Sequence, residues 1–276
     1  MSHTDTPSPS PSSSPSSPPP SSSPSLSSPS AQRGPARSVA PWSALTLSYR
    51  VVLRQLTSRG RLIALTALAL VATVAGIALG QADADLEAGV RLISGLGFAV
   101  IIPVVSLVFG GAAIGDLRDD KTLVYLWLRP MDRWPIVVGA FAAAVTLTAP
   151  ITLVPVVAAA ALAGSGGGLV AATIIAGLVA VVSYCAIFTM LGVALRRVIV
   201  WGLAYILIWE GFIALGGAGV ARFAIRKYTR SIIVDRTGID LDLADFSQTT
   251  GIIVPLIAAV VALAVASWRL ARQDID

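Results

Sequence analysis

Apolar residues in this chain form long uninterrupted stretches, and charged residues gather between them. A helix needs about 20 apolar residues to cross ~30 Å of hydrocarbon at a rise of ~1.5 Å per residue. Open strands leave backbone groups unpaired in lipid, so stretches of this kind are predicted to be transmembrane helices. Six of them reach or approach the required length, at about residues 62–80, 92–113, 135–162, 169–194, 198–218 and 251–268.

The six stretches predict an all-α integral membrane protein whose spanning domain covers residues 41–272. Pro103, Pro150 and Pro155 lie inside predicted spans and are expected to kink them. Gly76 and Gly80 form a small-xxx-small pair in the first span, which we interpret as a close packing contact between helices.

Residues 41–60 precede the first span and alternate with a helical period. Three arginines, Arg50, Arg54 and Arg59, flank the apolar face. The pattern predicts an N-terminal amphipathic helix in the headgroup layer on the cytoplasmic side. A cytosolic extension of the first span is the alternative. The apolar face comprises Trp42, Leu45, Tyr49, Val52, Leu53 and Leu56.

The N-terminal segment has a different composition, because residues 1–30 contain 15 Ser and 9 Pro. A segment with so little to bury cannot offset the entropy of ordering, so residues 1–37 are predicted to be a disordered cytoplasmic tail. It has no basic start and no apolar core, which excludes a signal peptide. A proline-rich ligand for a partner domain is the alternative.

The composition agrees with a membrane protein and excludes several kinds of chemistry. The chain is 55% hydrophobic and 13% charged, whereas soluble domains are about 25% charged. A disulfide scaffold is excluded because Cys185 is the only cysteine, and His3, in the tail, is the only histidine. No catalytic, metal or cofactor site is therefore predicted in this chain. Arginine outnumbers lysine 18 to 2, as is typical of high-GC bacterial genomes.

Basic residues indicate the orientation of the spans. If the amino terminus is inside, the inner segments hold 14 Lys and Arg and the outer segments hold 6. This excess predicts a multi-pass protein of the bacterial plasma membrane with both termini in the cytoplasm. The net charge of +5 is then an orientation signal, and no nucleic-acid partner is predicted.

The last outer segment, about residues 219–250, is a local exception because it carries five of the six outer basic residues. Apolar residues at helical spacing predict a short amphipathic helix on the outer leaflet, and an ordered plug over the bundle is the alternative. These residues are Ile225, Tyr228, Ile232 and Ile233.

The segment after the second span, about residues 114–134, has charge clusters at both ends of an apolar run from Thr122 to Leu128. Pro130 ends a helix and Pro135 suits the first turn of the next one, so a short cytoplasmic helix parallel to the membrane is predicted. Physical chemistry alone supports a solvated loop equally well. The run Gly115–Thr122 is not a phosphate-binding loop, since Asp120 replaces the glycine before the lysine and repels phosphate.

This segment resembles the signature of the type-2 ABC transporter permease family, the membrane subunits of ABC exporters. It departs from the family at Lys121, where a glycine is usual, and at Ala140, where a lysine is frequent. The matching residues are Gly115, Asp116, Thr122, Leu123, Leu126, Pro130, Arg133 and Gly139. A second patch, Tyr205–Gly211, is similar to a Tyr-x-x-x-Trp-Glu-Gly pattern in a bacterial branch of the family, and Arg222–Ile232 resembles the outer segment of that branch.

The resemblance implies the permease subunit of an ATP-driven exporter. It implies two kinds of partner besides the lipid bilayer: a separate cytosolic ABC ATPase that binds the ATP, and a second permease chain, identical or different. The segment 114–134 is then a coupling helix that receives force from the ATPase. The candidate coupling residues are Asp116, Asp119, Asp120, Thr122, Arg129 and Arg133. Two other classes stay open, namely a six-span scaffold or assembly protein and a secondary transporter.

Glu210 is the one charged residue well inside a predicted span, thirteenth in the stretch 198–218. A lone charge at that depth costs ~2.5–3.5 kcal/mol on insertion scales, so the side chain is expected to face the bundle interior. One interpretation is a polar site in the transport path or a link between protomers. The other is a buried carboxyl group hydrogen-bonded to Ser, Thr or Tyr of a neighbouring span.

Overall fold

The computed structural model describes residues 41–119, 133–163, 166–212, 224–239, 241 and 246–272. All of them belong to the unit Arg37–Asp276. The regular structure within these ranges is entirely helical. The predicted Ser/Pro-rich tail of residues 1–37 lies outside the described residues.

Five described helices are long and apolar enough to cross a membrane, which fits a multi-pass α-helical membrane protein. They match the predicted spans one, two, three, four and six. The second is continuous through three segments, α3 (Leu86–Leu92), η1 (Ile93–Ile101) and α4 (Ile102–Asp119). The other four are α2 (Arg59–Gln81), α6 (Trp134–Leu162), α7 (Gly166–Ala194) and α11 (Gln248–Arg272).

The predicted fifth span is described only in its first part. It comprises α8 (Val198–Ala204) and the π-helix η2 (Tyr205–Phe212). The apolar helix within it, Val198–Glu210, is shorter than a full span. Residues 213–218, the rest of the prediction, lie outside the described residues.

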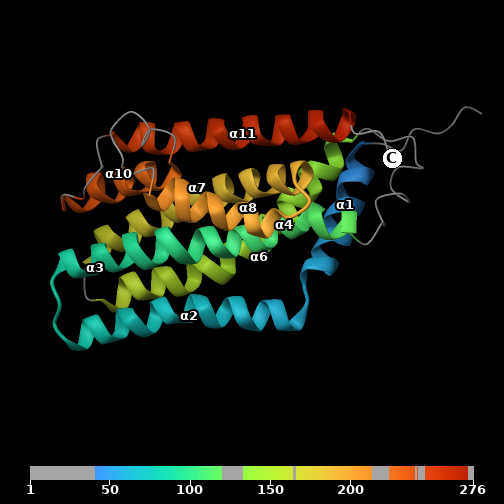
Figure 1. The fold of residues 1–276 in the computed structure, drawn as a ribbon. Coiled ribbons are helices and arrows are strands. Elements are labelled where there is room, and N and C mark those ends of the chain that lie inside the picture. Colours follow the sequence, from blue (N-terminus) through green and yellow to red (C-terminus); the bar gives the residue numbers. More distant parts are fainter. Residues whose placement is uncertain are drawn as a thin grey trace, which may run out of the picture. The chain divides into compact units, whose positions relative to one another are not determined.

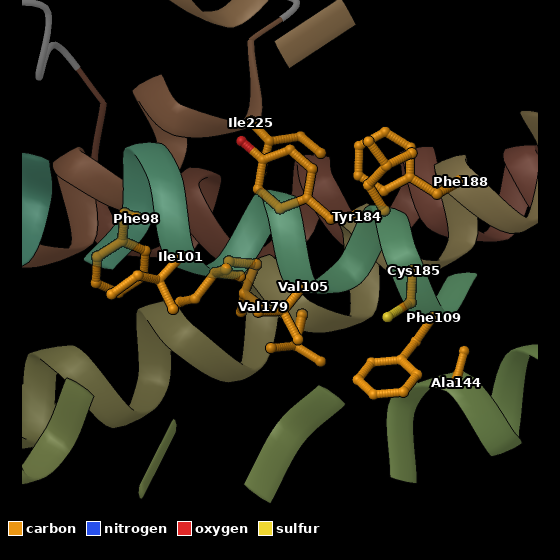
Figure 2. Close-up of a cluster of buried hydrophobic side chains, with 14 of the residues drawn as sticks. Phe98, Ile101, Val105, Phe109, Ala144, Val179, Tyr184, Cys185, Phe188 and Ile225 are labelled. Atoms are coloured by element: carbon orange, nitrogen blue, oxygen red, sulfur yellow. The ribbon is translucent and has the colours of Figure 1, made fainter. Parts of the chain in front are cut away.

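The helix α7 forms the centre of the bundle and packs against α4, α6, α10 and α11. Small residues allow this: a Cβ atom on Gly192 would lie 2.8 Å from the Gly111 carbonyl oxygen of α4. Large side chains fill the remaining space, and Figure 2 shows a cluster of them that comes mainly from η1, α4 and α7. It includes Phe98, Ile101, Val105, Phe109, Tyr184, Cys185 and Phe188.

The pair Gly76 and Gly80 packs α2 directly against α6, as the small-xxx-small pattern predicts. A Cβ atom on Gly76 would lie 2.6 Å from the Ala159 Cα, and one on Gly80 would collide with the Leu162 carbonyl oxygen. The Thr73 hydroxyl adds a hydrogen bond of 3.0 Å to the Pro155 carbonyl oxygen of α6.

All three prolines predicted to kink the spans lie inside helices, and the kinks themselves stay a prediction. Pro150 and Pro155 lie inside α6, which continues as an α-helix through both. Pro103 comes two residues after the π-helix η1, which the sequence analysis did not predict. Proline donates no hydrogen bond and its ring crowds the carbonyl four residues earlier, and a widened helix accommodates that crowding.

The amphipathic helix α1 (Pro41–Leu56) is present and buries one face against α6. The buried face agrees with the predicted one at Val52 and Leu56, and Leu45, Tyr49 and Leu53 are partly buried; the differences are that Trp42 is 75% exposed and that Ala44 and Ser48 join the contact. The reason is close packing on α6, where Ser48 lies against Gly139. The buried residues are Ala44, Ser48, Val52 and Leu56. Figure 1 shows α1 turned across the axes of the membrane helices.

The helix predicted in the last outer segment is α10 (Ile225–Thr237), and it ends at Gly238 in the left-handed conformation. Its four predicted apolar residues are all buried. They face α7 and α11, so the helix packs on the bundle, as the plug alternative expects. Gly251 makes this possible, because a Cβ atom there would lie 2.9 Å from the Tyr228 carbonyl oxygen.

Candidate functional site

The candidate coupling residues lie around the gap between α4 and α6. Asp116 and Arg133 are described, and Asp119 is the final residue of α4, although its side chain is not described. Asp120, Thr122 and Arg129 lie outside the described residues, as does the central part of the predicted coupling helix. We refer to residues 120–132 as the coupling segment.

Asp116 connects the start of the coupling segment to the first membrane helix. Its carboxylate forms an ion pair with Arg61 near the start of α2, with an Nη2 to Oδ2 distance of 3.1 Å. The two side chains are 35% and 27% exposed, respectively, so water partly screens the pair. The ion pair ties the end of α4 to α2.

Arg133 connects the end of the coupling segment to the last membrane helix. Its Nη1 donates hydrogen bonds to the carbonyl oxygens of Leu270 and Ala271, at 2.8 and 3.0 Å. These carbonyls belong to the last turn of α11, where a cation favours both the unpaired acceptors and the helix dipole. Asp116 before the coupling segment and Arg133 after it are therefore each bonded to a membrane helix that is distant in sequence.

Gly139 of α6 explains how α1 joins this region. A Cβ atom on Gly139 would lie 2.9 Å from the Ser48 Cβ and 3.0 Å from the Leu45 carbonyl oxygen. The Tyr49 hydroxyl donates a 3.4 Å hydrogen bond to the Thr146 hydroxyl, also on α6. The first half of α6 thus holds α1 by close packing and one hydrogen bond.

Glu210 forms the second polar site, inside the bundle. The side chain is buried, at 3% exposure, and its carboxylate accepts two backbone hydrogen bonds from α10. The Ile225 N–H donates to Oε1 at 2.9 Å and the Arg226 N–H donates to Oε2 at 3.1 Å. These N–H groups belong to the first turn of α10, so Glu210 caps that helix from a different element. Ala224 at the N-cap position has no side chain that caps.

The π-helix η2 accounts for a third hydrogen bond to Glu210. The Tyr205 hydroxyl donates to Oε1 at 3.3 Å, although it lies five residues earlier on the same helix. Residues five apart align in a π-helix because its hydrogen bonds run from i to i+5. Tyr184 of α7 also interacts electrostatically with Glu210, but no hydrogen bond of ordinary geometry joins them.

The partners of Glu210 differ in detail from those the sequence suggested. A tyrosine hydroxyl is among them, but it belongs to the same helix, and the other donors are backbone amides of α10. The one feature of the sequence that points to this contact is Ala224, which directly precedes a helical pattern and cannot cap a helix with its side chain. The N–H groups of the first turn therefore need an acceptor from another part of the chain.

Hydroxyl groups line the contact between α4, α6 and α7. The Cys185 thiol donates to the Thr148 hydroxyl at 3.5 Å. The hydroxyls of Ser106, Ser183 and Thr189 are buried and form no hydrogen bond with the described residues. Among all the residues that the structure describes, no three or more His, Cys, Asp or Glu side chains form a group that could hold a metal ion.

Neither a comparison with protein-family models nor one with curated protein sequences yields a match to this chain.

Proposed function

We propose that this chain is the permease subunit of an ATP-driven ABC exporter, coupled to a separate cytosolic ATPase. The observation that carries the proposal is the anchoring of the coupling segment at both ends. Asp116 binds Arg61 of α2 before it, and Arg133 binds the last turn of α11 after it. A push on this segment is therefore delivered to four helices, namely α4, α6, α2 and α11.

The anchored segment supports a mechanism of alternating access. Closure of the ATPases on ATP pushes the coupling segment, and α4 and α6 tilt because they continue directly from it. The helix α1 follows α6 because Ser48 and Gly139 leave no space between the two helices. The helix α8 follows α4 because Gly202 lies directly against Leu107. The tilt opens a route to the outer side, and no covalent chemistry occurs in this chain.

Glu210 extends this movement to the opposite end of the bundle. In the proposal, α8 and η2 belong to a complete fifth span over residues 198–218, and the carboxylate of Glu210 attaches α10 to it. When α8 and η2 move with α4, α10 moves with them. In this account Glu210 transmits motion and contacts no substrate.

The proposed assembly contains two permease chains and two ATPases in a bacterial plasma membrane, with both termini in the cytoplasm. The distribution of charge supports the orientation. Of the nine exposed arginines of the described residues, seven lie at the end of the bundle where α4 ends and α6 begins, and Arg91 and Arg236 lie at the other end. The seven are Arg50, Arg54, Arg59, Arg196, Arg197, Arg269 and Arg272.

Two other functions compete with this proposal. A six-span scaffold or assembly protein recruits a partner through the same coupling segment but transports nothing. A secondary transporter needs ionisable groups that pair and exchange protons or ions within the spans. The three donors on Glu210 include two backbone amides, which favours a structural cap over an exchange site.

Co-purification tests the proposal. The tagged chain is solubilised from native membranes together with the product of a neighbouring reading frame that encodes Gly-x-x-x-x-Gly-Lys-Ser/Thr. The proposal expects a complex with equal numbers of both chains, and it expects ATP hydrolysis by that complex. If repeated purifications yield the chain without an ATPase, the exporter proposal fails and the scaffold gains.

A further inference from the structure

The amphipathic helix α1 has a second face that the packing on α6 does not use. We call it the outward face of α1. Its exposed residues are Trp42, Ser43, Thr46, Leu47, Arg50, Val51 and Arg54, with Trp42 and Val51 at its two edges. Arg50 and Arg54 are four residues apart and therefore lie on the same side of the helix. Leu47 and Val51 form the neighbouring row, also four residues apart.

The charge of this face is of one sign only. The sequence contains no Asp or Glu between residues 6 and 82. Arg61 is engaged by Asp116, and within the described part of the chain no carboxylate pairs with Arg50 or Arg54. The outward face of α1 therefore presents two uncompensated positive charges.

Apolar side chains lie next to these charges, because Leu47 and Val51 each come three residues before one of the arginines, and Trp42 adds an exposed aromatic ring at the start of the helix. Trp42 is 75% exposed, Leu47 is 41% exposed and Val51 is 40% exposed. Tryptophan and aliphatic side chains mixed with arginine are typical of helices that lie in the membrane–water interface. Exposure of these apolar side chains to water is unfavourable, so their position beside the arginines indicates contact with something other than water.

The covalent link to α2 keeps α1 at the membrane surface. Only Thr57 and Ser58 separate the two helices, and two residues extend at most ~7 Å. The helix α2 is a membrane span that begins at Arg59. Figure 1 shows α1 lying across the bundle axis at this end, as an interfacial helix does.

The packing on α6 fixes which way the face points. Ser48 is wedged against Gly139, and Tyr49 is hydrogen-bonded to Thr146. The helix therefore cannot rotate its arginines toward the bundle without losing these contacts. The face is held in place before any ligand arrives, which lowers the entropic cost of binding.

We propose that the outward face of α1 binds the headgroups of anionic phospholipids. The guanidinium groups of Arg50 and Arg54 contact lipid phosphates, and the apolar residues of the face reach the boundary with the acyl chains. Arginine suits this task because its planar fork of donors matches phosphate oxygens. The inference is independent of an ATPase partner, since it concerns the surface of this chain alone.

A lipid titration of the full chain tests the inference. The delipidated protein in neutral detergent is titrated with fluorescent phosphatidylglycerol and, separately, with fluorescent phosphatidylcholine. The variant Arg50→Gln/Arg54→Gln removes both charges. At about 1 kcal/mol for each basic residue near an anionic surface, the affinity for phosphatidylglycerol should fall about thirtyfold. The affinity for phosphatidylcholine should not change.

Two further variants separate the face from net charge and from misfolding. Arg196→Gln/Arg197→Gln removes two exposed arginines from the turn between α7 and α8, at the same end of the bundle, and should keep the preference for phosphatidylglycerol. Arg50→Lys/Arg54→Lys keeps the charge and should retain most of the binding, which shows that the fold tolerates changes at these positions.

Four results overturn the inference. The first is an unchanged preference for phosphatidylglycerol in Arg50→Gln/Arg54→Gln. The second is an equal loss in the Arg196→Gln/Arg197→Gln control. The third is full competition by inorganic phosphate, which marks a site for the free anion. The fourth is retention of lipid binding in Arg50→Gln/Arg54→Gln together with loss of a co-purifying protein, which marks the face as a protein interface.

Discussion

The carboxylate of Glu210 lies 2.9 Å from the backbone nitrogen of Ile225 and caps the first turn of α10 from a separate helix. A charged residue within an apolar segment thereby receives hydrogen-bond donors, and no Lys or Arg side chain of the described residues forms an ion pair with it. Backbone amides at a helix N-terminus carry partial positive charge and are unpaired within the helix. The contact also joins two elements that are 15 residues apart in sequence.

Replacing Glu210 tests the cap. Glu210→Ala leaves the buried N–H group of Ile225 without an acceptor, at about 1–3 kcal/mol, and the partly buried N–H group of Arg226 adds a smaller loss. Glu210→Gln keeps one carbonyl oxygen and should lose about half as much, while membrane insertion is preserved. Thermal unfolding in detergent measures both changes. Equal stability of all three proteins would show that α10 needs no cap.

The same variants separate a structural role from a role in transport. A cap that is still partly formed in Glu210→Gln predicts transport close to that of the unchanged protein, because the carboxamide retains the acceptor for one amide. Abolished transport in Glu210→Gln, with stability and membrane insertion intact, would assign the carboxylate to proton exchange in the transport path.

The ion pair between Arg61 and Asp116 is expected to contribute modestly to stability. Its side chains are about one-third exposed, and screened pairs of this kind contribute about 0.2–1 kcal/mol. A double-mutant cycle with Arg61→Gln and Asp116→Asn measures the coupling. We also expect Asp116→Asn to reduce coupled ATP hydrolysis more than stability, and the exchange Arg61→Asp/Asp116→Arg to restore part of it. A coupling energy of zero would remove the link to α2.

Substitutions at two glycines test the contact between α1 and α6. Gly139→Ala places a methyl group 2.9 Å from the Ser48 Cβ and should destabilise the protein by about 1–3 kcal/mol. Gly60→Ala is the matched control, because a Cβ atom there meets nothing within 4 Å and alanine favours a helix. Chemical unfolding compares the two. Similar stabilities for both variants would show that α1 is not tightly packed on α6.

Arg133 is expected to protect the end of α11 from fraying. Arg133→Gln removes the cation from the carbonyls of Leu270 and Ala271, which should cost about 0.3–1 kcal/mol locally. Hydrogen exchange in a peptide covering residues 264–272 should become severalfold faster. Arg196→Gln, an exposed arginine in the turn between α7 and α8, is the control and should leave exchange in this peptide unchanged. Equal exchange rates in both variants would contradict the anchoring of α6 to α11.

Much of the fold follows from hydrophobic length alone, since five predicted spans coincide with helices. Some helices begin several residues earlier in the sequence than predicted. The second membrane helix begins at Leu86, where Asp85 accepts a hydrogen bond from the Ala88 N–H. Asp85 was a visible N-cap signal, but the apolar stretch itself begins only near residue 92, so apolar length set the predicted boundary.

The sites were less predictable because they depend on contacts between distant segments. The sequence shows Asp116 and Arg133 only as charged residues at the two ends of a predicted loop. Their partners, Arg61 and the last turn of α11, come close to them only when the helices pack. Sequence identified Glu210 as an anomaly in an apolar segment. Its partners depend on the π-helix at Tyr205, which has no periodic signature, and on where α10 packs, which the helical period of residues 225–233 does not give.

The most direct test of the central claim is crosslinking of the coupling segment to an ATPase. Thr122→Cys in a Cys185→Ser chain is crosslinked in native membranes, with and without ATP, and Thr249→Cys at the opposite end serves as control. The account predicts a crosslink to the ATPase from position 122 that changes with ATP, and none from position 249. Absence of any crosslink from position 122, or the same yield from both positions, would contradict coupling through this segment.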